Sequence, residues 1–162
     1  MQFHSFILAN MEDILREWEK FARTLPPSDT MSIEELRDDA EAILRTIAHD
    51  MTKKENSQQQ KDKSQGETSL NELAMTFARR HSTGRHEDGF DLNQVASEYR
   101  ALRATVVKLW TDEMKSNEDS AKLYQLIRFN EALDEALTYS ISQFLDKTQQ
   151  STPRGLKDKS SS

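Results

Sequence analysis

The sequence predicts an all-α fold, a helical bundle of about five helices, from three observations. Apolar residues recur at steps of three and four over long stretches, which is the period of an amphipathic helix. Only 4 Gly and 3 Pro occur in 162 residues, too few turn signals for a sheet of many strands. Ser or Asp, followed three residues later by Glu or Gln, also precedes several apolar stretches, a spacing typical of helix N-termini.

The first predicted helix covers residues 3–25. Its apolar positions form an a/d stripe: Ile7, Met11, Ile14, Trp18, Phe21 and Leu25. Pro26 and Pro27 end it, because the residue before a proline is disfavoured in the helical conformation. A capping box of Ser32 and Glu35 then opens a second helix at about 33–52.

The segment 53–68 contains no apolar side chain, so it cannot join a core and we expect a mobile loop. A connection this long can also be functional, and both interpretations stay open. Ser69 and Glu72 repeat the cap spacing before a short third helix that contains Phe77. The stretch 81–89 holds two of the four glycines and predicts a turn.

Asp91 and Gln94 open a fourth helix, whose apolar positions again follow heptads: Leu92, Val95, Tyr99, Leu102, Val106 and Leu109. The last predicted helix runs from near Asn117 to about Leu145. Asn130 interrupts its stripe, either fixing the register of paired helices or facing solvent. We therefore expect a helical domain at 1–146 and a flexible tail or linker fragment at 147–162.

Charge and composition exclude several classes of function. The net charge of −6 disfavours a general nucleic-acid binder. The absence of cysteine excludes a disulfide framework, a thiolate zinc site and a thiol nucleophile, and it fits a cytoplasmic protein. No apolar run approaches the roughly 18 residues of a membrane span, and the first residues lack the basic start of a signal peptide. We expect no nucleic-acid and no membrane partner.

No phosphate loop, serine-hydrolase elbow or zinc-protease motif occurs in the sequence, so we expect no enzyme activity, no catalytic residue and no metal site. His49 followed by Asp50 is similar to the phosphoacceptor pair of histidine kinases, or is a histidine stabilised at a helix C-terminus. His81 and His86 lie among arginines, which favours an anion, a polar small molecule or a solvated turn over a cation. A haem ligand at His81 is a further alternative.

Short motifs follow one another in a characteristic order. They are Ile14-Leu15-Arg16-Glu17-Trp18, Leu36-Arg37-Asp38-Asp39-Ala40, the stretch from Ile43 to Met51, and Glu98-Tyr99-Arg100-Ala101-Leu102-Arg103-Ala104. Together they resemble the RsbRD-type N-terminal sensor domain of bacterial sensor histidine kinases. The resemblance implies a globin-like, all-helical module that has no cofactor and that forms homodimers. It also implies a sensory input role in a two-component system, with the last helix leading to a C-terminal kinase, another output domain or a partner signalling protein.

This interpretation assigns residues to two sites. A ligand would lie between the third and fourth helices, at Phe77, His81, Arg85, Tyr99 and Arg103. The heptad stripes exceed the needs of one small core, so the dimer interface is expected at Ile14, Trp18, Val106, Trp110, Leu133 and Leu137. Glu98 is expected on a solvated flank or at the dimer rim. The alternatives are a phosphotransfer domain with His49 as acceptor and a stressosome-like interaction scaffold.

Overall fold

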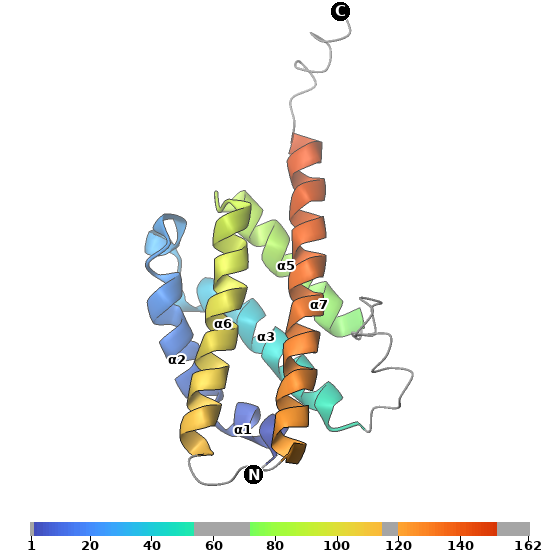
Figure 1. Cartoon of the computed structure of the whole chain (residues 1–162). Helices are drawn as coiled ribbons and strands as arrows, with labels where there is room; N and C mark the ends of the chain where they lie inside the picture. The colour runs from blue at the N-terminus through green and yellow to red at the C-terminus, as the bar shows by residue number, and fades with distance from the viewer. Residues whose placement is uncertain (1, 54–71, 115–119, 152–162) are drawn as a thin grey trace, which may run out of the picture.

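A computed structural model describes residues 2–53, 72–114 and 120–151 (Figure 1). Its helices are α1 (Phe3–Ala9), α2 (Met11–Ala22), α3 (Ile33–Met51), α5 (Glu72–Glu87), α6 (Leu92–Glu113) and α7 (Ser120–Ser151), with a short 3₁₀ helix at Pro26–Thr30. No strand occurs within these ranges, so the predicted all-α bundle is confirmed. The globin-like arrangement stays a prediction.

The helix α6 lies between α2 and α7, and α3 and α5 cross behind these three helices (Figure 1). The helix α7 packs on α5 and α6 and also contacts α3. It has 32 residues, so at about 1.5 Å per residue it is roughly 48 Å long. Its C-terminal turns project beyond the other helices (Figure 1).

One end of the bundle holds an aromatic cluster made of Phe3, Phe6, Trp110 and Phe129, all of them buried. The ring centroids of Phe3 and Trp110 are 5.0 Å apart in an edge-to-face arrangement, and those of Phe3 and Phe129 are 5.1 Å apart. These distances are favourable for aromatic pairs. The cluster therefore joins α1, α6 and α7 through contacts between aromatic rings.

The predicted single helix at 3–25 is wrong, because Asn10 divides it into α1 and α2. The Asn10 side chain donates a hydrogen bond to the carbonyl of Phe6 at 3.0 Å, and its backbone takes a non-helical conformation. An Asn side chain that bonds nearby backbone competes with helix continuation in this way. The break turns α1 toward α3, while α2 packs on α6.

The predicted turn at 81–89 is also wrong, since α5 continues to Glu87. The last helix continues to Ser151, so residues 147–151 are helical rather than part of a tail. The N-cap at Ser32 is confirmed, because its side chain accepts from the amide of Glu35, but the return bond of the predicted capping box is not among the described contacts. Asp91 and Gln94 form a reciprocal capping box, which confirms the cap predicted there. Parts of the prediction lie outside the described residues. They are the expected loop at 53–68 beyond residue 53, the cap at Ser69, the start of the last helix near Asn117 and the tail after residue 151.

None of the helices in the described ranges is long and apolar enough to cross a membrane.

Candidate functional site

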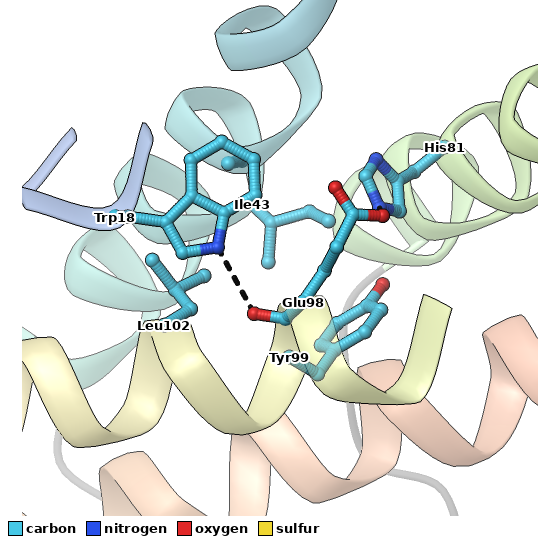
Figure 2. A pocket seen from close by; sticks show the side chains of 7 residues that line it. Trp18, Ile43, His81, Glu98, Tyr99 and Leu102 are labelled. Atoms are coloured by element: carbon cyan, nitrogen blue, oxygen red, sulfur yellow. Dashed lines mark hydrogen bonds and ion pairs between the residues drawn. The ribbon is translucent and has the colours of Figure 1, made fainter. Parts of the chain in front are cut away.

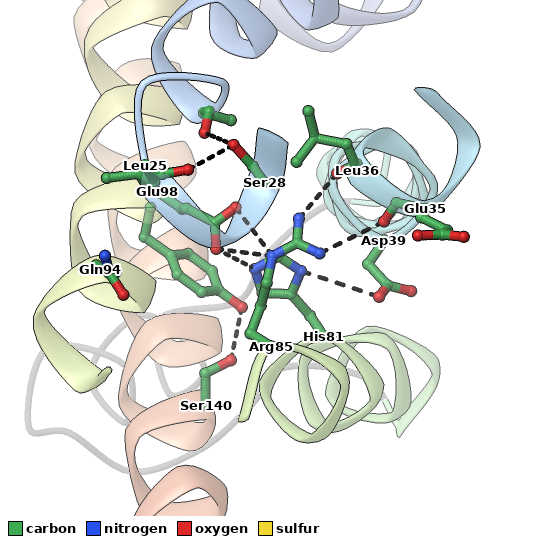
Figure 3. A network of polar contacts seen from close by, with 12 residues as sticks. Leu25, Ser28, Glu35, Leu36, Asp39, His81, Arg85, Gln94, Glu98 and Ser140 are labelled. Carbon is green, nitrogen blue, oxygen red and sulfur yellow. Dashed lines mark hydrogen bonds and ion pairs between the residues drawn. The ribbon is translucent and has the colours of Figure 1, made fainter. Parts of the chain in front are cut away.

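Charged side chains are buried where α3, α5 and α6 meet. We call Asp39, His81, Arg85 and Glu98 the polar cluster (Figure 3). Glu98 is 1% exposed and Arg85 is 2% exposed, and the Arg85 Nε donates to both carboxylate oxygens of Glu98 at 3.0 and 3.1 Å. The same guanidinium donates to the carbonyl of Leu36 on α3 at 3.0 Å. Arg85 therefore joins all three helices.

His81 adds a second contact to the same carboxylate. Its Nε2 lies 3.2 Å from the Glu98 Oε1, and its Nδ1 lies 3.9 Å from the Asp39 Oδ2 on α3. The imidazole is 4% exposed, so protein atoms surround it. Asp39 is also paired with Arg80 at 2.6 Å. Two carboxylates thus face the two nitrogens of one buried ring.

The environment of Glu98 keeps this carboxyl ionised. Burial alone raises its pKa, but the charges and hydrogen bonds of His81 and Arg85 outweigh burial, and the pKa lies below its ordinary value of 4.5. Two cationic or hydrogen-donating groups on one carboxylate favour its charged form. Glu98 is therefore an acceptor, and its neighbours are the donors.

The turn between α5 and α6 brings Arg85 and Glu98 together. Gly89 has a φ of 90°, a left-handed conformation that glycine adopts without a Cβ clash, and it reverses the chain directly after α5. The amide of Phe90 donates to the carbonyl of Arg85 at 2.9 Å, and the guanidinium of Arg85 lies 5.1 Å from the Phe90 ring centroid. The Asp91 cap then starts α6.

A hydroxyl network connects the neighbouring residue, Tyr99, to α7. We call Tyr99, Ser140 and Ser82 the α7 link. The Ser140 Oγ donates to the carbonyl of Ala78 at 3.0 Å, so the Tyr99 hydroxyl, 2.6 Å away, is the donor of the pair. Ser82 donates to the carbonyl of Ser140 at 2.7 Å. Burial raises the pKa of Tyr99 above its ordinary value of 10, so the hydroxyl keeps its proton.

A small cavity lies beside the polar cluster (Figure 2). Its volume of about 10 Å³ is near the lower limit for one water molecule. The indole of Trp18 forms one wall, and its Nε1 donates to the backbone carbonyl of Glu98 at 3.0 Å. The cavity provides no space for the macrocycle of a haem. A haem iron bound to the His81 Nε2 would also have to displace Glu98 from that nitrogen.

The structure brings together three of the five residues predicted for a ligand site: His81, Arg85 and Tyr99. Phe77 is separate, partly buried under the guanidinium of Arg80 at 5.0 Å. Arg103 is about a third exposed and pairs with Asp134 on α7. The predicted ligand site is therefore only partly assembled.

Glu98 is the main residue that the sequence interpretation assigned wrongly, as a solvated flank. It lies three residues after Val95 and four before Leu102, both buried, so helical spacing places it on the buried face of α6. That spacing was a usable signal. Asp39 and Ser140 were missed, and no local pattern marks them, because their partners are on other helices.

The residues predicted for a dimer interface lie in the core of a single chain. Ile14, Trp18, Val106, Trp110 and Leu133 are at most 1% exposed, and Leu137 packs partly buried against them. Side chains without exposed surface cannot bind a second chain unless the fold opens. Dimerisation stays a prediction, and of these six residues only Leu137 keeps exposed surface that a second chain could contact.

His49 is exposed near the end of α3 and lines an open groove of about 700 Å³ between α3 and α5. The exposure allows access to the imidazole, and phosphotransfer at His49 stays a prediction. Within the described ranges, no group of three or more His, Asp or Glu side chains is arranged to hold a metal ion.

A family model described as the RsbT co-antagonist protein rsbRD N-terminal domain matches residues 12–155. It covers nearly the whole chain and confirms the resemblance seen in the sequence motifs. No curated protein and no solved structure matches the chain.

Proposed function

Because the chain belongs to the family of rsbRD N-terminal domains, we propose that it is a sensory input and dimerisation module that acts through the geometry of α7 rather than through chemistry of its own. The family is related to the stressosome, which is consistent with a sensory or scaffold role. The output would be a histidine kinase region or another signalling protein that α7 reaches.

One observation carries the proposal: the α7 link joins α5 and α6 to the middle of α7 next to the polar cluster. Tyr99 follows Glu98 in the chain, and its hydroxyl bonds to Ser140, which is fully buried. A change in the packing of α3, α5 or α6 at the polar cluster therefore reaches α7 through two adjacent residues. The turns of α7 that project beyond the bundle would transmit that change (Figure 1).

A second copy of the chain fits the exposed side of α7. Leu123 and Ile127 are 58% and 50% exposed, and Leu145 is 46% exposed. Leu137 and Ile141, partly buried, lie on the same stripe at helical steps. A stripe along a 32-residue helix needs a partner helix of similar length, and the longest other described helix has 22 residues. A two-fold pairing of α7 with itself supplies one.

Light scattering after size exclusion tests the dimer. We expect a mass of about twice 18.7 kDa for the chain and of 18.7 kDa for Ile127→Glu. Leu73→Glu is the matched control, because Leu73 is 56% exposed on α5, and it should leave the dimer intact. A monomeric parent chain at all concentrations would contradict the proposal.

The transmission step is tested with a chimera in which the chain precedes a histidine kinase region. Ser140→Ala removes a buried hydroxyl from the α7 link, and we expect it to change the basal autophosphorylation rate severalfold. Thr138→Ala, an exposed position on the same helix, is the control. Equal rates for the two variants would contradict transmission through this link.

The second candidate is a scaffold. The family's description as a co-antagonist favours it, since a co-antagonist acts together with other proteins. A scaffold would give a particle much larger than a dimer in the same light-scattering experiment. A strict dimer with a kinase response would favour the input module instead.

A further inference from the structure

We propose that His81 is a proton-binding link between α3 and α6, in which the imidazole takes a second proton at Nδ1 and then bridges Asp39 and Glu98. This inference goes beyond the proposed function, since it concerns the chain alone and needs neither a partner nor an output region. Its experiment can therefore fail while the proposed function holds, and the reverse is also true.

The tautomer of His81 follows from its partners. Glu98 is ionised and paired with Arg85, so its oxygens only accept hydrogen bonds. The Nε2 at 3.2 Å must therefore carry a hydrogen. A neutral imidazole then has a lone pair at Nδ1, and Nδ1 has no hydrogen-bond partner among the described residues. The carboxylate of Asp39 lies 3.9 Å from it, and both atoms are acceptors.

The charges around the ring are balanced only while the imidazole is neutral. The α3 helix contributes Asp39, α5 contributes Arg80 and Arg85, and α6 contributes Glu98 and the neutral Tyr99. The α2 helix contributes the uncharged Trp18, and α7 contributes the uncharged Ser140. Each arginine already binds one of the two carboxylates. A second proton on His81 adds a positive charge that has a carboxylate at each nitrogen.

Protonation changes the contact between α3 and α5. At Nδ1 it converts two facing acceptors into a donor and an acceptor, and a small rotation of the partly exposed Asp39 closes the distance. The imidazolium then connects α3 to α6 through α5. Uptake of this proton therefore tightens the junction of the three helices.

Long-range ¹H–¹⁵N NMR spectra of the imidazoles test the link directly. The chain has 4 histidines, and His81→Gln assigns the signal. At alkaline pH we expect hydrogen on Nε2 alone, and at lower pH on both nitrogens. In Asp39→Asn, the second proton should need about a tenfold higher proton concentration, as expected for loss of an opposite charge within about 4–6 Å.

His86 is the internal control for this titration. It lies on the same helix, contacts Phe144 and Thr148 on α7, and has no contact with Asp39 among those described. Its titration should be the same in both proteins. Equal proton uptake by His81 in the two proteins would overturn the proposal, and so would hydrogen on Nδ1 at alkaline pH.

Urea unfolding at pH 8 and pH 6 gives a second readout. The folded imidazolium gains a partner, so the added stability is present at low pH and is lost as the pH rises. When the pH is lowered from 8 to 6, the equilibrium constant for unfolding of the parent chain should fall by up to about tenfold more than that of Asp39→Asn. A ratio of the two unfolding constants that does not change with pH contradicts the link. So does a ratio that changes by the same factor when both chains also carry His81→Gln.

Discussion

The aromatic cluster and the polar cluster hold the same bundle together by opposite means. In the aromatic cluster, the rings of Phe3, Phe6, Trp110 and Phe129 fill space and contact one another edge-to-face or tilted. In the polar cluster, Arg85 and Glu98 are as deeply buried, but each depends on the other for charge and hydrogen bonds. Apolar packing tolerates changes of shape, whereas a buried ion pair tolerates the loss of neither partner. The polar cluster therefore depends more on particular partners than the aromatic cluster does, and a single substitution disturbs it more easily.

The largest effect is expected for Glu98→Ala, which leaves the Arg85 guanidinium buried without its carboxylate. We expect a loss of about 3–5 kcal/mol in the free energy of unfolding, measured with urea. This is a large part of the free energy of unfolding of a typical domain, which is roughly 5–15 kcal/mol. The joint replacement of Glu98→Leu and Arg85→Met is the control, because it removes both charges. If the pair acts as a unit, the double variant is more stable than Glu98→Ala.

Acid should weaken the polar cluster and not the aromatic cluster. The pKa of Glu98 lies below 4.5 in the folded chain because of His81 and Arg85. The stability from this carboxylate is therefore present above the unfolded value and is lost as the pH falls through the folded value. The free energies of unfolding of the parent chain and of Glu98→Gln, measured with urea between pH 6 and pH 3, should converge as the pH falls. Curves that stay parallel would contradict this role of Glu98.

A smaller effect is expected in the α7 link. Ser140→Ala leaves the Tyr99 hydroxyl buried without its acceptor, and about 1–3 kcal/mol of stability should be lost. Tyr99→Phe removes the hydroxyl itself and should lose about 1 kcal/mol. The double variant should be less destabilised than the sum of the two, which would show that the two hydroxyls act on each other. Additive losses would show that they are independent.

The apolar part of the core should respond weakly to a change of shape at constant volume. Ile14 is fully buried, and Ile14→Leu is expected to lose less than about 1.5 kcal/mol. Differential scanning calorimetry should show a modest decrease in the melting temperature. A loss of stability as large as that of Glu98→Ala would contradict the distinction between apolar packing and the polar cluster.

The smallest effect is expected for exposed ion pairs. Arg45 and Glu41 are one helical turn apart on α3, and both side chains are nearly half exposed. Arg45→Ala should change the stability by at most about 0.5 kcal/mol, because solvent screens such pairs. The same urea titration measures it, and a loss above about 1 kcal/mol would mean that charge as such, and not burial, sets the cost.

The sequence predicts the apolar part of this fold well and the polar part poorly. Helical periodicity locates Leu36, Ile43, Val95 and Leu102 on buried faces, since each carries its own signal. On α5 the buried residues are small or polar, with Ala74, Ala78, Ser82 and Arg85 on one face, so hydrophobic periodicity does not detect them. Gly84 also lowers helix propensity by about 1 kcal/mol relative to alanine, and tertiary contacts override it.

The candidate site depends on pairs that a single sequence does not reveal. Arg85 looks like a turn residue until Glu98 is placed beside it, and Asp39 looks like one acid among many on α3. A charged residue at a buried helical position, as at Glu98, is the local sign that a partner must exist. Which helix supplies the partner follows only from the packing of the bundle.

The two tryptophans of the chain lie on opposite sides of this comparison. Trp18 donates to the backbone of Glu98 beside the polar cluster, and Trp110 is packed between the rings of Phe3 and Phe6 in the aromatic cluster. Each cluster thus has its own fluorophore. With Trp110→Phe or Trp18→Phe, the emission of the remaining indole reports the solvation of one cluster alone, so the order in which the clusters open can be observed optically without an added label.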